Sequence, residues 1–165
     1  MPTDFSGAFT ELRSILKKHS VGLKVIKDTQ LDFTVTSPGV APNKKPLWFG
    51  CVLQKKSAVT FHFMPLYFNP KLIGQVPAEL LKRMQGKTCF NFQRPDPVLF
   101  GMLDVVVGLG REQWERAGLL ADGPISGERI MLAAKAGGTN IDALAKKRKA
   151  KGRSSAAKRA QARPN

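Results

Sequence analysis

The 165-residue sequence is short of several residue types, and each shortage excludes a class of protein. It has only two cysteines, Cys51 and Cys89, so a disulfide-stabilised framework is excluded and free thiols are expected. No apolar run approaches the roughly 18 residues that a membrane-spanning helix requires. The first residues include Asp4 and Glu11 and no apolar segment, so we expect no secretory signal. These absences predict a cytoplasmic protein.

Acidic residues are also few, and the resulting positive charge is concentrated at one end. The chain has 27 lysines and arginines against 12 aspartates and glutamates, a formal net charge of +15. Residues 135–165 hold ten of the basic residues and a single acidic one, Asp142. After Leu144 there is no aromatic residue and no aliphatic residue larger than alanine. Such a segment cannot bury enough apolar surface to offset its ordering entropy, so we expect residues 136–165 to be a disordered tail rich in Lys, Arg and Ala.

The rest of the chain has the composition of one folded domain and a connector. Hydrophobic residues make up 42% of the sequence, which is enough for a sizeable core. We expect an α+β domain over residues 1–118. Residues 119–135 include Gly123 and Pro124, and they are expected to form a connector with a short helix at 128–135.

The first half of the chain shows one helical pattern followed by several strand patterns. Apolar residues at helical spacing predict a helix over residues 5–19, with Asp4 or Ser6 as its N-cap. Residues 37–46 contain three prolines and are expected to be a loop. Alternating and continuous apolar runs predict strands at 22–27, 31–36, 47–54 and 58–64.

The second half of the chain begins with a short helix and another strand. Pro77 is expected in the first turn of a helix over residues 78–85, and Gly86 is expected to end that helix. Residues 87–93 return to strand character.

A longer helix follows, which Asp96 caps and Pro97 begins. We expect Gly108 and Gly110 to break it before residues 111–117. Two adjacent apolar stripes predict a broad buried face on it, and they consist of Val98, Met102, Val105 and Leu109 and of Leu99, Leu103 and Val106. A helix, a series of strands and a second long helix together predict an antiparallel sheet in an α+β fold.

Three segments carry a resemblance to a known family. They are residues 45–50 (KPLWFG), 63–67 (FMPLY) and 77–92 (PAELLKRMQGKTCFNF), of which Met-x-Gly-Lys-x-Cys-x-Asn-Phe is the most specific part. Over residues 8–118 the chain resembles the YdhG-like domain family, which is small and bacterial. The resemblance implies a curved antiparallel sheet of about five strands, packed by an N-terminal helix and a C-terminal helix.

One lineage of that family is described as a frataxin-like iron chaperone. Iron chaperones of this type present clustered carboxylates, because hard iron ions prefer oxygen ligands. The first predicted helix here carries Glu11 as its one acidic residue, beside Arg13, Lys17 and Lys18. A basic surface repels cations, so iron handling is an alternative and not the leading prediction. We expect no cofactor.

Period-two alternation along the strands places a set of polar side chains on the face opposite the helices. The candidate ligand-binding residues there are Thr60, His62, Lys87, Cys89 and Asn91, and Thr34 and Thr36 share the same face. Tyr67 follows the last residues of a predicted strand and is a candidate for a pocket rim, because its hydroxyl needs a polar partner. Such a face can bind a small polar or anionic ligand. The alternative is a solvated sheet face with a few cross-strand hydrogen bonds.

The cysteines and histidines predict neither a metal site nor a catalytic centre. Cys51, Cys89, His62 and His19 lack zinc-motif spacing, and strand parity does not unite Cys51 with the others. Buried structural thiols are the simpler interpretation. A nucleophilic pair of Cys89 and His62 would need hydrogen-bond reach and a third, orienting group, for which Asn91 is the nearest candidate in sequence.

The basic tail predicts contact with a polyanion. Binding to nucleic acid would release counterions, which gives strong salt dependence and little sequence preference. A solubilising extension and an electrostatic contact with an anionic membrane surface are the alternatives. The candidate nucleic-acid residues are Lys146, Lys147, Arg148, Lys149, Lys151, Arg153, Lys158 and Arg159.

The sequence therefore predicts a non-enzymatic YdhG-like domain that binds a ligand or partner. Its basic tail is predicted to contact nucleic acid without sequence specificity. The alternative is a protein that handles a small molecule or a metal such as iron, in which the tail is incidental.

Overall fold

The computed structural model describes residues 2–135, so the predicted tail at 136–165 lies outside the described residues. The chain runs through α1 (Phe5–Lys18), β1 (Lys24–Asp28), β2 (Asp32–Val40), β3 (Pro46–Gln54), β4 (Val59–Phe63), α2 (Pro65–Phe68), α3 (Pro70–Gly74), α4 (Ala78–Leu81), β5 (Met84–Gln85), β6 (Cys89–Phe92), α5 (Pro97–Arg116), β7 (Gly123–Pro124) and α6 (Gly127–Lys135). This order confirms the predicted α+β class.

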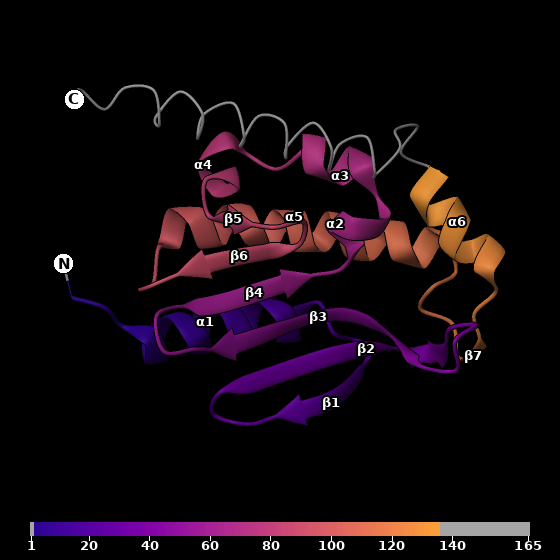
Figure 1. Ribbon diagram of the computed structural model, residues 1–165, viewed down its shortest axis with the longest axis horizontal. Coiled ribbons are helices and arrows are strands. Elements are labelled where there is room, and N and C mark those ends of the chain that lie inside the picture. Colours follow the sequence, from indigo (N-terminus) through magenta and orange to yellow (C-terminus); the bar gives the residue numbers. More distant parts are fainter. Residues whose placement is uncertain (1, 136–165) are drawn as a thin grey trace, which may run out of the picture.

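The sheet is open and has the strand order β1-β2-β3-β4-β6-β5 (Figure 1). All neighbours in that order are antiparallel, and the five longer strands correspond to the five predicted from the sequence. The two-residue strand β5 extends one edge. The equally short β7 pairs with β2 in a parallel arrangement, which the sequence patterns did not predict.

Helix α1 forms as the sequence predicts, because its cap and its apolar spacing agree. The carboxylate of Asp4 accepts a hydrogen bond from the backbone N–H of Gly7 at 2.9 Å, which satisfies a free donor of the first turn. The last turn carries Lys17 and Lys18, whose charges suit the negative end of the helix dipole. Its buried residues are Ala8, Phe9, Leu12 and Leu16.

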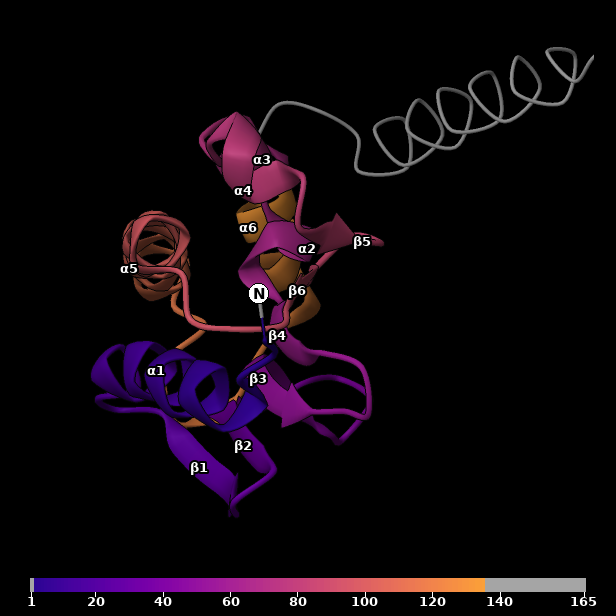
Figure 2. The same ribbon diagram turned by 90° about the vertical axis from the view of Figure 1, so that its left-hand side faces the viewer.

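The main core lies between the sheet and the two long helices, α1 and α5, which lie on the same side of the sheet (Figure 2). Strand residues that point to this side are largely aromatic and aliphatic. Phe33, Val52, Phe61 and Phe90 lie opposite one another across four strands, and all are buried. Each large buried side chain removes apolar area from water and contributes roughly 1.5–3 kcal/mol to folding.

Helix α5 is continuous, so the predicted break at Gly108 and Gly110 is wrong. A Cβ atom at Gly110 would lie 2.5 Å from the ring of Phe63 and 2.9 Å from Pro65, so glycine there permits close packing of the helix on the core. Only one of the two predicted stripes is fully covered. Val98 and Val105 from the other stripe are 67% and 63% exposed.

The predicted loop at 37–46 is shorter than expected, because β2 continues to Val40. The chain that follows α5 holds this extension in place. The hydroxyl of Ser37 donates to the carbonyl of Leu119, and the N–H of Ile125 donates to the carbonyl of Val40. Leu119 and Ile125 are buried, so the first part of the expected connector packs on the domain, and its predicted short helix is α6.

The helix predicted at 78–85 is also shorter in the structure. Helix α4 ends at Leu81, and Pro77 is its N-cap residue and not its first helical residue. Met84 and Gln85 form β5, because they pair with β6. Gly86 has a positive φ of 73°, but it lies in the turn between β5 and β6 instead of ending a helix.

A charged cluster joins the end of α1 to the middle of α5. One carboxylate oxygen of Asp104 lies 2.6 Å from His19 Nε2, and the other accepts a hydrogen bond from Lys18 Nζ at 2.8 Å. Partial burial acts to raise the pKa of Asp104, but the hydrogen bonds from Lys18 and His19 outweigh it and hold that pKa below its usual range. The guanidinium of Arg111 also donates to the carbonyl of His19.

Candidate functional site

The side of the sheet away from α1 and α5 carries two rows of mostly polar side chains. In one row, Thr34, Cys51, His62 and Cys89 lie opposite one another on successive strands. In the neighbouring row, Asp32, Leu53, Thr60 and Asn91 do the same. Asp32, Leu53, His62, Cys89 and Asn91 are only partly buried, so solvent reaches this surface. We call these eight residues the open face.

A cysteine–histidine contact lies at the centre of the open face. Cys89 Sγ is 2.9 Å from His62 Nδ1, which is within hydrogen-bond reach. The hydroxyl of Thr88 lies 3.7 Å from the same sulfur. His62 and Cys89 come from β4 and β6 and are 27 positions apart, and the register of these strands places them opposite each other.

Cys51 lies on the same face, on the other side of His62. The expectation that strand parity separates Cys51 from the other residues is wrong, because parity describes one strand and the register decides how strands align. Cys51 is 1% exposed. Burial raises the pKa of its thiol to about 12, with smaller contributions in the same direction from Asp32 and Cys89. Cys51 therefore stays a protonated thiol at neutral pH.

His62 has the opposite shift, as expected for a base that loses solvent. Burial, together with the positive charge of Lys55, holds the pKa of His62 below its usual range. At pH 7 the imidazole is therefore neutral, and one ring nitrogen can accept a proton.

Asn91 does not orient His62, so the three residues are not arranged as a catalytic triad. The hydroxyl of Thr60 donates to Asn91 Oδ1 at 2.7 Å, and Asn91 Nδ2 donates to Gln85 Oε1 at 2.8 Å. These bonds form a separate chain across β4, β6 and β5. They are the cross-strand hydrogen bonds that the solvated-face alternative predicts.

Lys87 and Tyr67 form a third group at the edge of the sheet. Lys87 Nζ lies 5.3 Å from the centre of the Tyr67 ring, a cation–π contact. The turn through Gly86 presents Lys87, and Tyr67 belongs to α2 and is 39% exposed. All six predicted ligand-binding residues thus make contacts with one another or with Gln85 and Thr88, in three small groups. Thr36, which was predicted on the same face, is fully buried.

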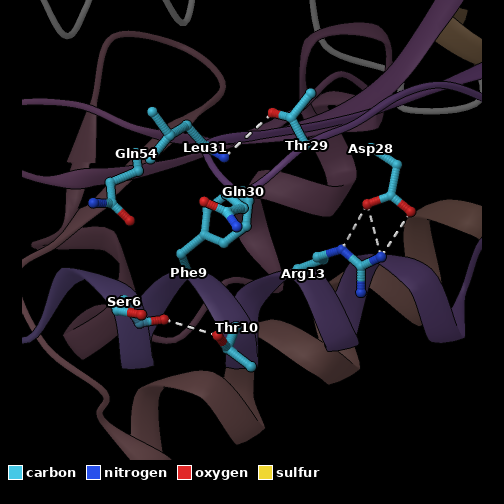
Figure 3. Close-up of a pocket in the computed structure, with 9 residues that line it drawn as sticks. All are labelled: Ser6, Phe9, Thr10, Arg13, Asp28, Thr29, Gln30, Leu31 and Gln54. Carbon is cyan, nitrogen blue, oxygen red and sulfur yellow. Dashed lines mark hydrogen bonds and ion pairs between the residues drawn. The ribbon is translucent and has the colours of Figure 1, made fainter.

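Sequence patterns did not reveal the pocket beside the start of α1 (Figure 3). Its volume is about 780 Å³. The guanidinium of Arg13 forms two hydrogen bonds of 2.7 Å with the carboxylate of Asp28, and it lies 4.9 Å from the centre of the Phe33 ring. Arg13 belongs to α1, Asp28 to β1 and Phe33 to β2, so the packing of the helix on these strands brings them together and spacing along the chain gives no signal for the pocket. The lining residues are Ser6, Phe9, Thr10, Arg13, Asp28, Thr29, Gln30, Leu31 and Gln54.

The described residues contain neither a cluster of metal ligands nor a membrane-spanning helix. Within residues 2–135, no group of three or more His, Cys, Asp or Glu side chains is arranged to hold a metal ion. No helix in the same part of the chain is long and apolar enough to cross a membrane. The predicted nucleic-acid residues, from Lys146 to Arg159, lie outside the described residues.

Comparison with known proteins does not add an identification. No family model matches the chain, and neither a curated protein nor a solved structure shows a significant similarity to it. The resemblance to the YdhG-like family stays a prediction from the quoted motifs.

Proposed function

We propose that this protein is a non-enzymatic, YdhG-like binding domain that contacts nucleic acid through its basic C-terminal segment. The open face would bind a small polar or anionic ligand or a partner. The observation that carries the proposal is the distribution of charge. Ten lysines and arginines accompany a single acidic residue in residues 135–165, whereas the preceding 134 residues hold seventeen basic and eleven acidic residues.

Ion pairs within the domain support this proposal. Asp28 pairs with Arg13, Asp32 with Lys27, and Asp104 with Lys18 and His19. These carboxylates repel a polyanion less because their charges are already compensated. Lysines near the open face add to the positive potential, and Lys55 acts on both Cys51 and His62.

The experiment is fluorescence anisotropy with labelled duplex DNA, titrated with the full-length protein at several salt concentrations. In one variant, Lys146, Lys147, Arg148 and Lys149 are changed to glutamine. The matched control removes the same charge from the folded domain by changing the exposed residues Lys24, Lys44, Lys45 and Lys71 to glutamine. Each lost phosphate contact lowers the slope of log affinity against log salt by about 0.9, so the loss of four contacts is expected to lower the slope by about 3.6.

The control variant is expected to keep most of that slope, because long-range charge alone does not replace close phosphate contacts. If both variants weaken binding equally, net charge alone is responsible and the proposed role of the C-terminal segment is wrong. If the wild-type protein does not bind DNA near physiological salt, the nucleic-acid function is wrong as a whole.

The pocket beside α1 favours small-molecule handling as a second candidate function. Its lining is mostly polar and contains the Arg13–Asp28 pair, which suits a ligand with hydroxyl or carboxylate groups. The test is a thermal-shift screen of the full chain with small carboxylates, polyols and ferrous iron. A genuine ligand raises the melting temperature of the wild type, and the Gln54→Ala variant should reduce that rise. The candidate fails if no compound shifts the melting temperature.

A further inference from the structure

The open face contains one reactive arrangement that ligand binding does not require. Cys89 is partly exposed, and its sulfur lies 2.9 Å from His62 Nδ1. His62 is also partly exposed, so a small molecule can approach the pair from solvent. Because the imidazole is neutral, it can accept the thiol proton when the sulfur attacks an electrophile.

Two lysines place positive charge near this pair. Lys55 adds to the effect of burial in lowering the pKa of His62. Asp32, the carboxylate of the open face, is paired with Lys27. Lys87, two residues before Cys89, places an ammonium group beside Tyr67 on the same edge of the sheet. An electrophile that carries negative charge would therefore be attracted to the sulfur of Cys89.

We propose that Cys89 and His62 form a nucleophilic thiol site that reacts with small anionic disulfides to give a mixed disulfide. As the sulfur of Cys89 attacks one sulfur of the disulfide, its proton moves to His62 Nδ1. A new S–S bond forms at Cys89, the original S–S bond breaks, and the departing thiolate takes the proton from His62. Cys89 is oxidised and the small disulfide is reduced to one free thiol and one protein-bound half. This proposal is independent of nucleic-acid binding.

The second thiol cannot complete the reaction by forming an internal disulfide. Cys51 and Cys89 each lie opposite His62, on the two strands that flank β4. Adjacent strands are about 4.8 Å apart, so the two Cα atoms are roughly 10 Å apart, beyond the usual limit of about 7 Å for a disulfide. Cys51 is also buried and protonated. The product is therefore a stable modification of Cys89, which an external thiol reverses.

The test measures the rate of modification of the full-length native protein with two reagents at pH 7. The dianionic disulfide dithiobis(nitrobenzoate) and the neutral disulfide dithiodipyridine each release a coloured thiol. Rates are divided by those of the same protein in denaturant, where the native contacts are lost. One rapidly reacting thiol per chain is expected, which Cys89→Ser removes and Cys51→Ser retains.

His62→Gln is expected to slow the native reaction with both reagents by roughly a hundredfold, the lower end of what a positioned base contributes, and to leave the denatured rate unchanged. Lys87→Gln should slow only the dianionic reagent. Lys17→Gln removes the same charge from α1 on the other side of the sheet, and it should leave the rate of the dianionic reagent unchanged.

Circular dichroism and thermal melting check that each variant is folded, and His62→Asn provides a second substitution if the glutamine variant is unstable. The proposal is overturned if Cys89 reacts no faster in the native than in the denatured protein. It is equally overturned if the folded His62 variants react at the wild-type rate.

Discussion

The two sides of the sheet use the same strands for different purposes. The side under α1 and α5 is lined by residues such as Phe61 and Phe90, which are fully buried. The open face alternates with them and carries His62 and Cys89, which are partly exposed and in hydrogen-bond contact. Adjacent positions on one strand therefore differ in environment, because successive side chains point to opposite sides.

The two sides of the sheet therefore differ in what they contribute to the stability of the domain. Apolar packing under the helices contributes most of the folding free energy. The open face contributes less, because its hydrogen bonds compete with water. Five of its eight side chains are correspondingly in partial contact with solvent. Four sets of variants test how the packed and the solvent-facing parts of the domain contribute to its stability.

The largest difference is expected between two neighbours on β4. Phe61→Ala should lower the free energy of unfolding by about 3–5 kcal/mol, because it leaves a large cavity in the core. His62→Ala, one position further along and on the open face, should lower it by about 1 kcal/mol. Urea denaturation at pH 7 measures both. Similar losses for the two variants would show that the open face is as important for stability as the core.

The next test compares two glycines of α5. Gly110→Ala places a Cβ atom 2.5 Å from the ring of Phe63, so overpacking should cost about 1–3 kcal/mol. At Gly101, which is exposed, a Cβ atom would meet nothing within 4 Å. Gly101→Ala should therefore stabilise the protein by up to about 1 kcal/mol through helix propensity. Thermal melting detects the opposite signs, and a loss of stability at Gly101 would contradict the described packing.

The Asp104 cluster adds a pH-dependent contribution to the helical layer. Asp104→Asn should lower the free energy of unfolding by about 1–2 kcal/mol at pH 7, since hydrogen bonds to a charged group are lost. The pKa of Asp104 is lower in the folded protein than in the unfolded chain. The stabilising effect of the Asp104 carboxylate is thus complete above its ordinary pKa of 3.8. It is lost as the pH falls through the lower pKa that Asp104 has in the folded protein.

The difference between wild type and Asp104→Asn should therefore shrink below that pH, as measured by urea denaturation at several pH values. Glu115→Gln on the same helix is the control, because Glu115 makes no ion pair within residues 2–135. A difference that is constant down to pH 2 would exclude the ion pairs as its cause.

The smallest effects are expected for two threonines on the side of the sheet away from the helices. Thr60 donates a hydrogen bond to Asn91, so Thr60→Val should lose about 1 kcal/mol. Thr36 Oγ1 is buried and has no hydrogen-bond partner among the described residues. Thr36→Val removes that unsatisfied group and should raise the free energy of unfolding by up to about 1 kcal/mol. Chemical denaturation measures the free energy of unfolding of both variants. Changes of the same sign would contradict the hydrogen-bond assignment.

Much of the fold could be predicted because the deciding signals are local. Asp4 and Asp96 are N-caps of α1 and α5, as their positions before apolar periodic segments indicate. The predictions failed where a distant segment decides the outcome. Gly110 does not break α5 because Phe63 packs against it, and residues 37–40 join β2 because the chain after α5 pairs with them.

The candidate site shows the same division. Alternation assigned His62, Cys89 and Asn91 to one face. It did not indicate that Cys51 lies in the same row as His62, that Asn91 bonds to Thr60 and Gln85, or that Arg13 meets Asp28 beside a pocket. Each of these depends on how separate elements align.

Composition and local pattern are enough to predict the class of fold, the side of the sheet on which each strand residue lies, and the concentration of positive charge after residue 134. These follow from composition and from the fixed periods of helices and strands. Only the tertiary structure decided that Cys89 lies 2.9 Å from His62 and that Cys51 is buried beyond it. Strand order and register arise from contacts between residues far apart in the chain, and no local pattern encodes them.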